Sequence, residues 1–275
     1  MTDWLTVKRG EAPLLLSLPH TGTDIPDEFQ PGLVSLWRAR RDADWWIDRL
    51  YDFAEGLGAT IVHTAISRTV IDVNRDPSGV SLYPGQATTE LCPTATFDGE
   101  PLYQQGREPS AEEIARRKAL FHTPYHAALK AQIARLRETH PAIVLYDCHS
   151  IRSVIPRLFE GELPQFNIGT NLGVSCDPAL QEAVEAITAT SGFSSVSNGR
   201  FKGGFITRSL GNPAAGVHAV QMELAGRGYV REPKEAPTPE NWPTPYEAAY
   251  AAPLREHLEA ILAACLAFAE GRATR

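Results

Sequence analysis

The stretch Ile143-Val144-Leu145-Tyr146-Asp147-Cys148-His149-Ser150 decides the fold class, because an apolar run ends there in groups that bind metal or carry protons. The run indicates a buried strand. Side chains alternate along a strand, so Asp147 and His149 should face one way and Cys148 the other. This weakens the alternative of a nucleophilic Cys148–His149 pair, and Cys148 is better interpreted as a small buried residue.

Other short apolar runs alternate with longer helical patterns along the chain. This alternation is typical of an α/β fold with a mostly parallel sheet covered on both faces. The predicted strands are residues 14–18, 59–65, 142–147, 165–169 and 218–224. No repeat, low-complexity tract or Ser/Gly linker divides the chain, so we predict a single domain over residues 1–275.

Capping residues mark the starts of the predicted helices. The predicted helices are 44–57, capped by Asp44 and ended by Gly58; 110 to about 140, capped by Ser110 with Glu113 and interrupted at Pro124; and two that start at Asp177-Pro178 and Thr244-Pro245. Residues 66–106 are rich in Gly, Pro and Thr and carry few regular signals. Because this segment is longer than a simple connection between two elements needs to be, we interpret it as a loop region that helps to build a site.

Composition and charge exclude several classes of function. With 43% hydrophobic and 21% charged residues, the chain is neither disordered nor fibrous. Its net charge of -7 argues against sequence-independent binding to the phosphates of nucleic acid. A local cationic pocket for a small anion is compatible with this net charge. The apolar runs are far shorter than the ~20 residues of a membrane span. The N-terminal residues lack a secretory signal and the four cysteines are scattered, so we expect a cytoplasmic protein with reduced thiols.

Two further strands end in polar groups, at the edge where open α/β sheets bind ligands. His20 follows strand 14–18 on a turn that contains Gly22, and Glu223 lies near the end of strand 218–224. Taken alone, His20 is a turn residue or a ligand. Glu223 is either a surface acid or a general base with a raised pKa.

A different pair, His122 and His126, has the spacing of two zinc ligands on a helix. The glutamate of the H-E-x-x-H motif is missing and Pro124 breaks the helix, so we interpret the pair as a partly exposed helix face. The Gly-rich segment 198–208 also carries three cations but matches no nucleotide-binding motif. Its cations are suited to holding carboxylates.

Taken together, these motifs resemble the N-formylglutamate amidohydrolase family. The stretches that carry the resemblance are residues 17–22, 44–45, 67–68, 71–75, 147–153, 198–204, 207–208 and 221–224. Each is weak alone, but their joint order and spacing are specific. The resemblance implies a three-layer α/β/α fold around a mixed, mostly parallel sheet, similar to zinc carboxypeptidases and zinc-dependent amidases.

The resemblance also implies one zinc ion, or another divalent metal, held by His20, Asp44 and His149. Three protein ligands leave a position for water, as in catalytic rather than structural zinc sites. Asp24 and Asp27 are alternatives nearer to His20 in sequence. We prefer Asp44 because it opens a predicted helix, as the acidic ligand does in the amidases; its other interpretation is a plain helix cap.

The reaction that the resemblance implies is hydrolysis of N-formyl-L-glutamate to formate and L-glutamate, a step of histidine degradation. Glu223 matches the residue that serves as general base and then as general acid in these zinc hydrolases. Arg68 is the cation expected to stabilise the oxyanion.

The implied substrate is a small dianion, so cations should gather at the site. Asn74 and Arg75 are predicted to hold one carboxylate and Arg208 the other, with Lys202 as a further substrate-binding cation. Arg200 is expected in a surface ion pair. No nucleic acid, membrane or obligate protein partner is implied.

Two alternatives remain open at this stage. One is a zinc amidohydrolase of similar fold that cuts another N-acyl amino acid or a peptide. The other is a non-catalytic protein that senses an anionic metabolite, although a sensor has no use for a positioned base such as Glu223. The size of the acyl pocket separates the first alternative from a deformylase.

Overall fold

A seven-stranded mixed sheet forms the centre of the described part of the chain. The computed structural model describes residues 4–80, 85 and 88–272. The strands are β1 (Leu5–Lys8), β2 (Leu14–Leu18), β3 (Thr60–Thr64), β4 (Ile143–Ile151), β5 (Phe166–Gly169), β6 (Ser195–Ser197) and β7 (Val217–Ala225). Their order is β1-β3-β2-β4-β7-β5-β6, in which β3, β2, β4 and β7 run parallel. β1 and β5 are antiparallel to β3 and β7, respectively, so the sheet is mixed but mostly parallel.

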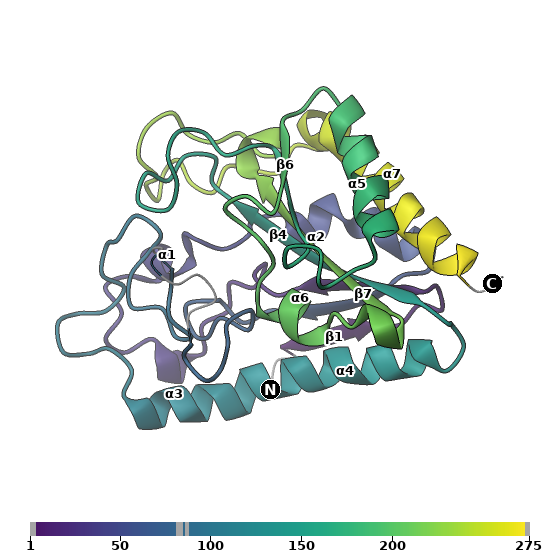
Figure 1. Ribbon diagram of the computed structural model, residues 1–275. Coiled ribbons are helices and arrows are strands. Elements are labelled where there is room, and N and C mark those ends of the chain that lie inside the picture. Colours follow the sequence, from purple (N-terminus) through teal and green to yellow (C-terminus); the bar gives the residue numbers. More distant parts are fainter. Residues whose placement is uncertain (1–3, 81–84, 86–87, 273–275) are drawn as a thin grey trace.

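Helices cover both faces of this sheet, which confirms the predicted three-layer α/β/α fold (Figure 1). One face packs against α2 (Ile47–Leu50), α5 (Pro178–Thr190) and α7 (Ala248–Gly271) through one apolar core. The other face packs against α4 (Thr123–Arg137) and α6 (Phe205–Leu210) through a second core. None of the described helices combines the length and the apolar character that a membrane-spanning segment needs.

Strand β4 lies in the middle of the sheet, and all nine of its residues are buried. Cys148 packs in the core beside α5 and α7, whereas Leu145 packs in the core beside α4. Asp147 and His149 share the face of Leu145, so the predicted alternation is confirmed. The strand extends past its predicted end at residue 147, because its polar residues keep pairing with β7 as far as Ile151.

The predicted strands all form, within a few residues of their expected ends. Two strands were not predicted. β1 is a four-residue edge strand whose side chains are half-buried or exposed, and β6 has only three residues. Such short edge strands carry too little apolar pattern to be found from sequence.

The predicted helix from Asp44 to Leu57 is wrong. The chain forms the short α2, capped by Trp46 in a left-handed conformation, and then a 3-10 helix at Asp52–Leu57. The Asp44 carboxylate does not cap a helix, because it accepts a hydrogen bond from the Ser150 N–H at 3.0 Å. Gly58 ends the segment as predicted, with φ of 69°.

The other helix starts are partly confirmed. Ser110 caps α3 (Ala111–Arg117), a π-helical turn follows at Lys118–His122, and α4 ends at Arg137 rather than near residue 140. Asp177 caps α5 as predicted. The last helix starts at Ala248 rather than at Thr244-Pro245, because the Thr244 hydroxyl donates to the Arg231 carbonyl instead of capping.

Candidate active site

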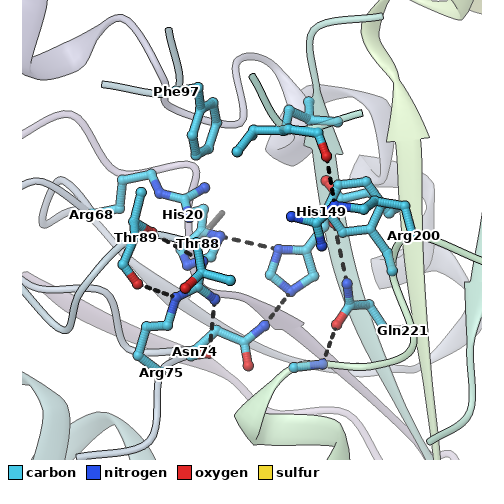
Figure 2. Close-up of a pocket in the computed structure, with 15 residues that line it drawn as sticks. His20, Arg68, Asn74, Arg75, Thr88, Thr89, Phe97, His149, Arg200 and Gln221 are labelled. Atoms are coloured by element: carbon cyan, nitrogen blue, oxygen red, sulfur yellow. Dashed lines mark hydrogen bonds between the residues drawn. The ribbon is translucent and has the colours of Figure 1, made fainter. Parts of the chain in front are cut away.

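Three segments bring His20, Asp44 and His149 together at the carboxyl ends of β2 and β4. Their possible ligand atoms all lie within 4.8 Å of one another, and all three residues are buried. The Nδ1 atoms of His20 and His149 face each other at 3.1 Å (Figure 2). Asp44 Oδ2 lies 3.7 Å from the first and 3.3 Å from the second.

Each histidine is held from behind by a buried carboxylate. His20 Nε2 bonds to Asp72 Oδ1 at 2.7 Å, and His149 Nε2 bonds to Asp147 Oδ2 at 2.9 Å. Histidines that bind metals commonly donate their second ring N–H to a carboxylate in this way. Two ring nitrogens and one carboxylate are also a donor set of catalytic zinc sites, so these residues fit a metal ion.

The charges of this cluster compensate one another. Burial raises the pKa of Asp44, but its hydrogen bond to His149 and the charges of His20 and Arg68 outweigh burial, so the net pKa is lowered. Burial lowers the pKa of His149, and the charge of Asp147 outweighs it, so the net pKa is well above its usual value. Burial, together with Arg68, lowers the pKa of His20.

Glu223 joins the site from the neighbouring strand. The register of β4 and β7 pairs His149 with Glu223 directly. Gln221 Nε2 donates to Glu223 Oε2 at 3.1 Å. Burial raises the pKa of Glu223 to about 7, against the opposing effect of His149. A carboxyl group with a pKa near neutrality can both take and return a proton at the pH of the cell.

His20, His149 and Glu223 line one pocket, together with Arg68, Arg75 and Arg200. Arg68 Nη2 donates to Asp72 Oδ2 at 2.8 Å, and the Phe97 ring lies 4.8 Å from its guanidinium carbon. The Arg75 side chain donates to the backbone oxygen and the hydroxyl of Thr89, at 3.1 and 3.0 Å. All of these residues except Asp72 line the pocket.

Comparison of the sequence with known protein families identifies the family. Residues 12–230 match the sequence profile of the N-formylglutamate amidohydrolase family. The chain belongs to that family.

Two curated relatives of the family match nearly the whole chain, and both are called N-formylglutamate deformylase. The relative from Pseudomonas aeruginosa is 48% identical over 264 residues, which is 96% of this chain and 97% of the relative. The relative from Pseudomonas putida is 45% identical and covers 100% of both chains. The crystal structure of N-formylglutamate amidohydrolase from Ralstonia eutropha JMP134 has the same fold, with a TM-score of 0.75, 24% identity and 97% coverage of both chains.

The side chain of Asn74 lines the pocket, but its amide group already has hydrogen-bond partners within the protein. Asn74 Nδ2 donates to Asp147 Oδ2 at 3.2 Å and lies 2.9 Å from His149 Nε2, and Asn74 Oδ1 accepts from the Ile206 N–H at 2.8 Å. The close approach depends on Gly204, because a Cβ atom there would lie 2.5 Å from Asn74 Nδ2. Asn74 therefore braces the back of the metal-ligand candidates.

The Gly-rich segment contributes a different cation from the one expected. Arg200, expected on the surface, lines the pocket and donates from Nε to the Leu158 carbonyl at 2.8 Å. Lys202 and Arg208 are not among the described residues of the pocket lining. Arg208 Nε donates to the Gly203 carbonyl at 2.8 Å instead.

Other lining residues were missed by sequence reasoning. Gln221 could have been found, because it lies two residues before Glu223 and so shares its face of β7. Thr89 and Phe97 come from the irregular segment 66–106, which has no helix or strand in its described part. Such a loop has no periodicity that would reveal which side chains point inward.

Proposed function

We propose that this chain hydrolyses N-formyl-L-glutamate to formate and L-glutamate, that it requires a zinc ion, and that it acts in histidine degradation. The observation that carries the proposal is the placing of Glu223 opposite His149, beside the buried group of His20 and Asp44. Family membership and two full-length relatives called N-formylglutamate deformylase support the choice of substrate. We also propose that residues 1–275 act as one catalytic domain.

The zinc ion would be held by Nδ1 of His20, Nδ1 of His149 and the Asp44 carboxylate. When bound, zinc supplies Lewis acidity, which makes a water molecule more acidic and a carbonyl carbon more electrophilic. Asp72 and Asp147 would fix the two imidazole rings in the orientation that the ion needs.

Glu223 would move the proton. Its Oε1, the oxygen that does not accept from Gln221, takes a proton from water as the oxygen of that water attacks the formyl carbon. The same carboxyl group then gives this proton to the amine nitrogen of glutamate as the C–N bond breaks. Arg68 lines the pocket and would stabilise the negative charge that develops on the formyl oxygen.

The two carboxylates of the substrate would be bound by arginines on separate walls. Figure 2 shows Arg75 and Arg200 on opposite sides of His149, and both line the pocket. We assign one carboxylate to Arg75, with Asn74 bracing the site from behind. Arg200 is a better candidate than the predicted Arg208 for the other carboxylate, because Arg200 lines the pocket.

The test of the function is formate release from N-formyl-L-glutamate by the zinc-loaded protein. Because the apolar side chains of Phe97 and Ile151 line the pocket, N-acetyl-L-glutamate should react with a kcat/KM about 10- to 200-fold lower, the usual effect of one extra carbon in an apolar pocket. Formate and acetate are measured in parallel. Equal rates would instead favour an amidohydrolase of broader N-acyl specificity, and no cleavage of either amide would contradict the proposal.

Cys148 is expected to be dispensable. It is buried in the core on the opposite face of β4 from His149, and burial raises the pKa of its thiol well above the usual value. Cys148→Ala should therefore retain kcat within about twofold, at a cost of about 1 kcal/mol in the free energy of unfolding. Steady-state kinetics and a denaturant titration check both. A folded variant without turnover would revive the thiol mechanism.

A further inference from the structure

His122 and His126 pack against the backbone of residues 73–75, a segment that contributes Asn74 and Arg75 to the pocket lining. Only 3% of His122 and 7% of His126 are exposed, which corrects the prediction of a partly exposed helix face. Their rings stack with centroids 4.4 Å apart and an angle of 24° between the planes. The rings are covered by the segment that carries Asn74 and Arg75, an arrangement that helical periodicity alone does not reveal.

The backbone of residues 73–75 is held by three donors from other segments. Each of its three consecutive carbonyls accepts a hydrogen bond from one of them, and the Asn74 carbonyl also accepts from Arg75 Nη1 at 3.4 Å. The donors are His126 Nε2 for Val73 at 2.7 Å, the Phe205 N–H for Asn74 at 3.4 Å, and His122 Nε2 for Arg75 at 3.0 Å. Because a buried carbonyl without a donor costs free energy, these bonds fix the path of the backbone.

Both histidines act as uncharged donors in this arrangement. A carbonyl oxygen only accepts, so the proton of each ring is on Nε2. Burial lowers the pKa of His122, and burial, followed by the unfavourable effect of a second positive charge beside His122, lowers the pKa of His126 to about 4. Among the described residues, His122 and His126 belong to no group of three or more His, Cys, Asp or Glu side chains that could hold a metal ion.

The backbone that they hold carries side chains of the site. The Asn74 side chain donates to Asp147, and the Asn74 backbone N–H donates to Asp72 Oδ1 at 2.9 Å. Arg75 reaches Thr89 and lines the pocket. A shift of this backbone would therefore move two side chains together: Arg75, a substrate-binding candidate, and Asn74, which contacts the Asp147 carboxylate behind His149.

We propose that His122 and His126 are positioning residues, whose Nε2–H groups set the backbone of residues 73–75 so that Arg75 meets a carboxylate of the substrate. This inference rests on the proposed function. This positioning role requires a hydrogen-bond donor at residues 122 and 126. An apolar side chain would not fulfil it, and no acid–base group is needed.

The test compares His126→Leu, which removes the donor, with His126→Gln, which restores an N–H near the position of Nε2. In His126→Leu we expect KM for N-formyl-L-glutamate to rise about tenfold, the scale of one buried hydrogen bond, with kcat changed less than KM. His126→Gln should recover most of the loss. His218→Leu is the matched control, because His218 is also buried but bonds to the Asp177 N–H.

Binding of glutarate, a dicarboxylate that cannot be cleaved, is measured by calorimetry in the same proteins. Its Kd should rise about tenfold in His126→Leu and recover in His126→Gln. A parent value in the folded Leu variant, an equal loss in both variants, or a parent that binds no glutarate would each overturn the inference. If His126→Leu does not fold, His122→Leu and His122→Gln make the same comparison. A parent that binds glutarate but releases no formate refutes the proposed function and leaves the binding comparison as the test.

Discussion

Glu223→Gln is expected to lower kcat by about 10²- to 10⁴-fold, the usual contribution of a general acid–base group. The substitution keeps the size of the side chain and an oxygen that can accept the hydrogen bond from Gln221. It removes the ability to take a proton from water and return it to the leaving amine. Zinc content and melting temperature should stay close to those of the parent, because Glu223 is not among the proposed ligands.

Turnover, zinc content by elemental analysis and thermal unfolding are measured on the same preparation. Glu232→Gln is the matched control, since burial also raises the pKa of Glu232, whose Oε1 accepts from the Ser153 N–H at 2.8 Å. Glu232 is not among the described residues of the pocket lining. Undiminished turnover in Glu223→Gln would show that the proposed mechanism is wrong. Loss of zinc along with turnover would instead make Glu223 a metal ligand.

The individual strands could be predicted, because each strand is marked by the pattern of apolar residues within its own segment. An apolar run that ends in polar groups identified β4, and the two-residue repeat placed Asp147 and His149 on one face. The same reasoning found the strand that carries Glu223. The order and register of the strands bring Glu223 beside His149. They depend on pairing between distant segments, which no pattern within a single sequence reveals.

The predicted helix starts were wrong at two positions, where the side chain expected to cap the helix has another hydrogen-bond partner. Asp44 has the sequence context of a helix cap, but its carboxylate bonds to Ser150, more than one hundred residues away. Thr244 likewise donates to Arg231 rather than capping a helix. Capping rules assume that the side chain accepts a hydrogen bond from a backbone N–H two or three residues later. In both cases the side chain forms a tertiary hydrogen bond instead.

The pocket walls were the least predictable part of the site. Arg200 and Arg208 lie in one Gly-rich segment, and the sequence analysis placed Arg208 at a substrate carboxylate and Arg200 in a surface ion pair. The backbone turns at Asn198 and Gly203, with φ of 52° and 103°, and the segment presents Arg200 rather than Arg208 to the pocket. The burial of His126 was missed for a related reason, because it depends on how an irregular segment packs against α4.

Removal of the metal is expected to abolish formate release, by about 10³-fold or more, because a Lewis acid contributes several kcal/mol to the stabilisation of the transition state. Zinc should restore the activity of the chelated parent. His149→Ala should not recover, because it removes one of the two nitrogens that face each other at 3.1 Å. His63→Ala is the control, since His63 lies on β3 and is not among the described residues that line the pocket of His20 and His149.

The stability of the protein gives a second and independent measurement of the same site. A ligand that binds only the folded state at 1,000 times its Kd stabilises it by about 4.1 kcal/mol, so zinc should raise the melting temperature of the parent. The same zinc concentration should have little effect on His149→Ala, because a buried site with two remaining ligands binds the ion weakly. Formate release that is indifferent to chelation would contradict the metal assignment. A zinc-dependent rise in stability that persists in His149→Ala would show that the ion binds elsewhere.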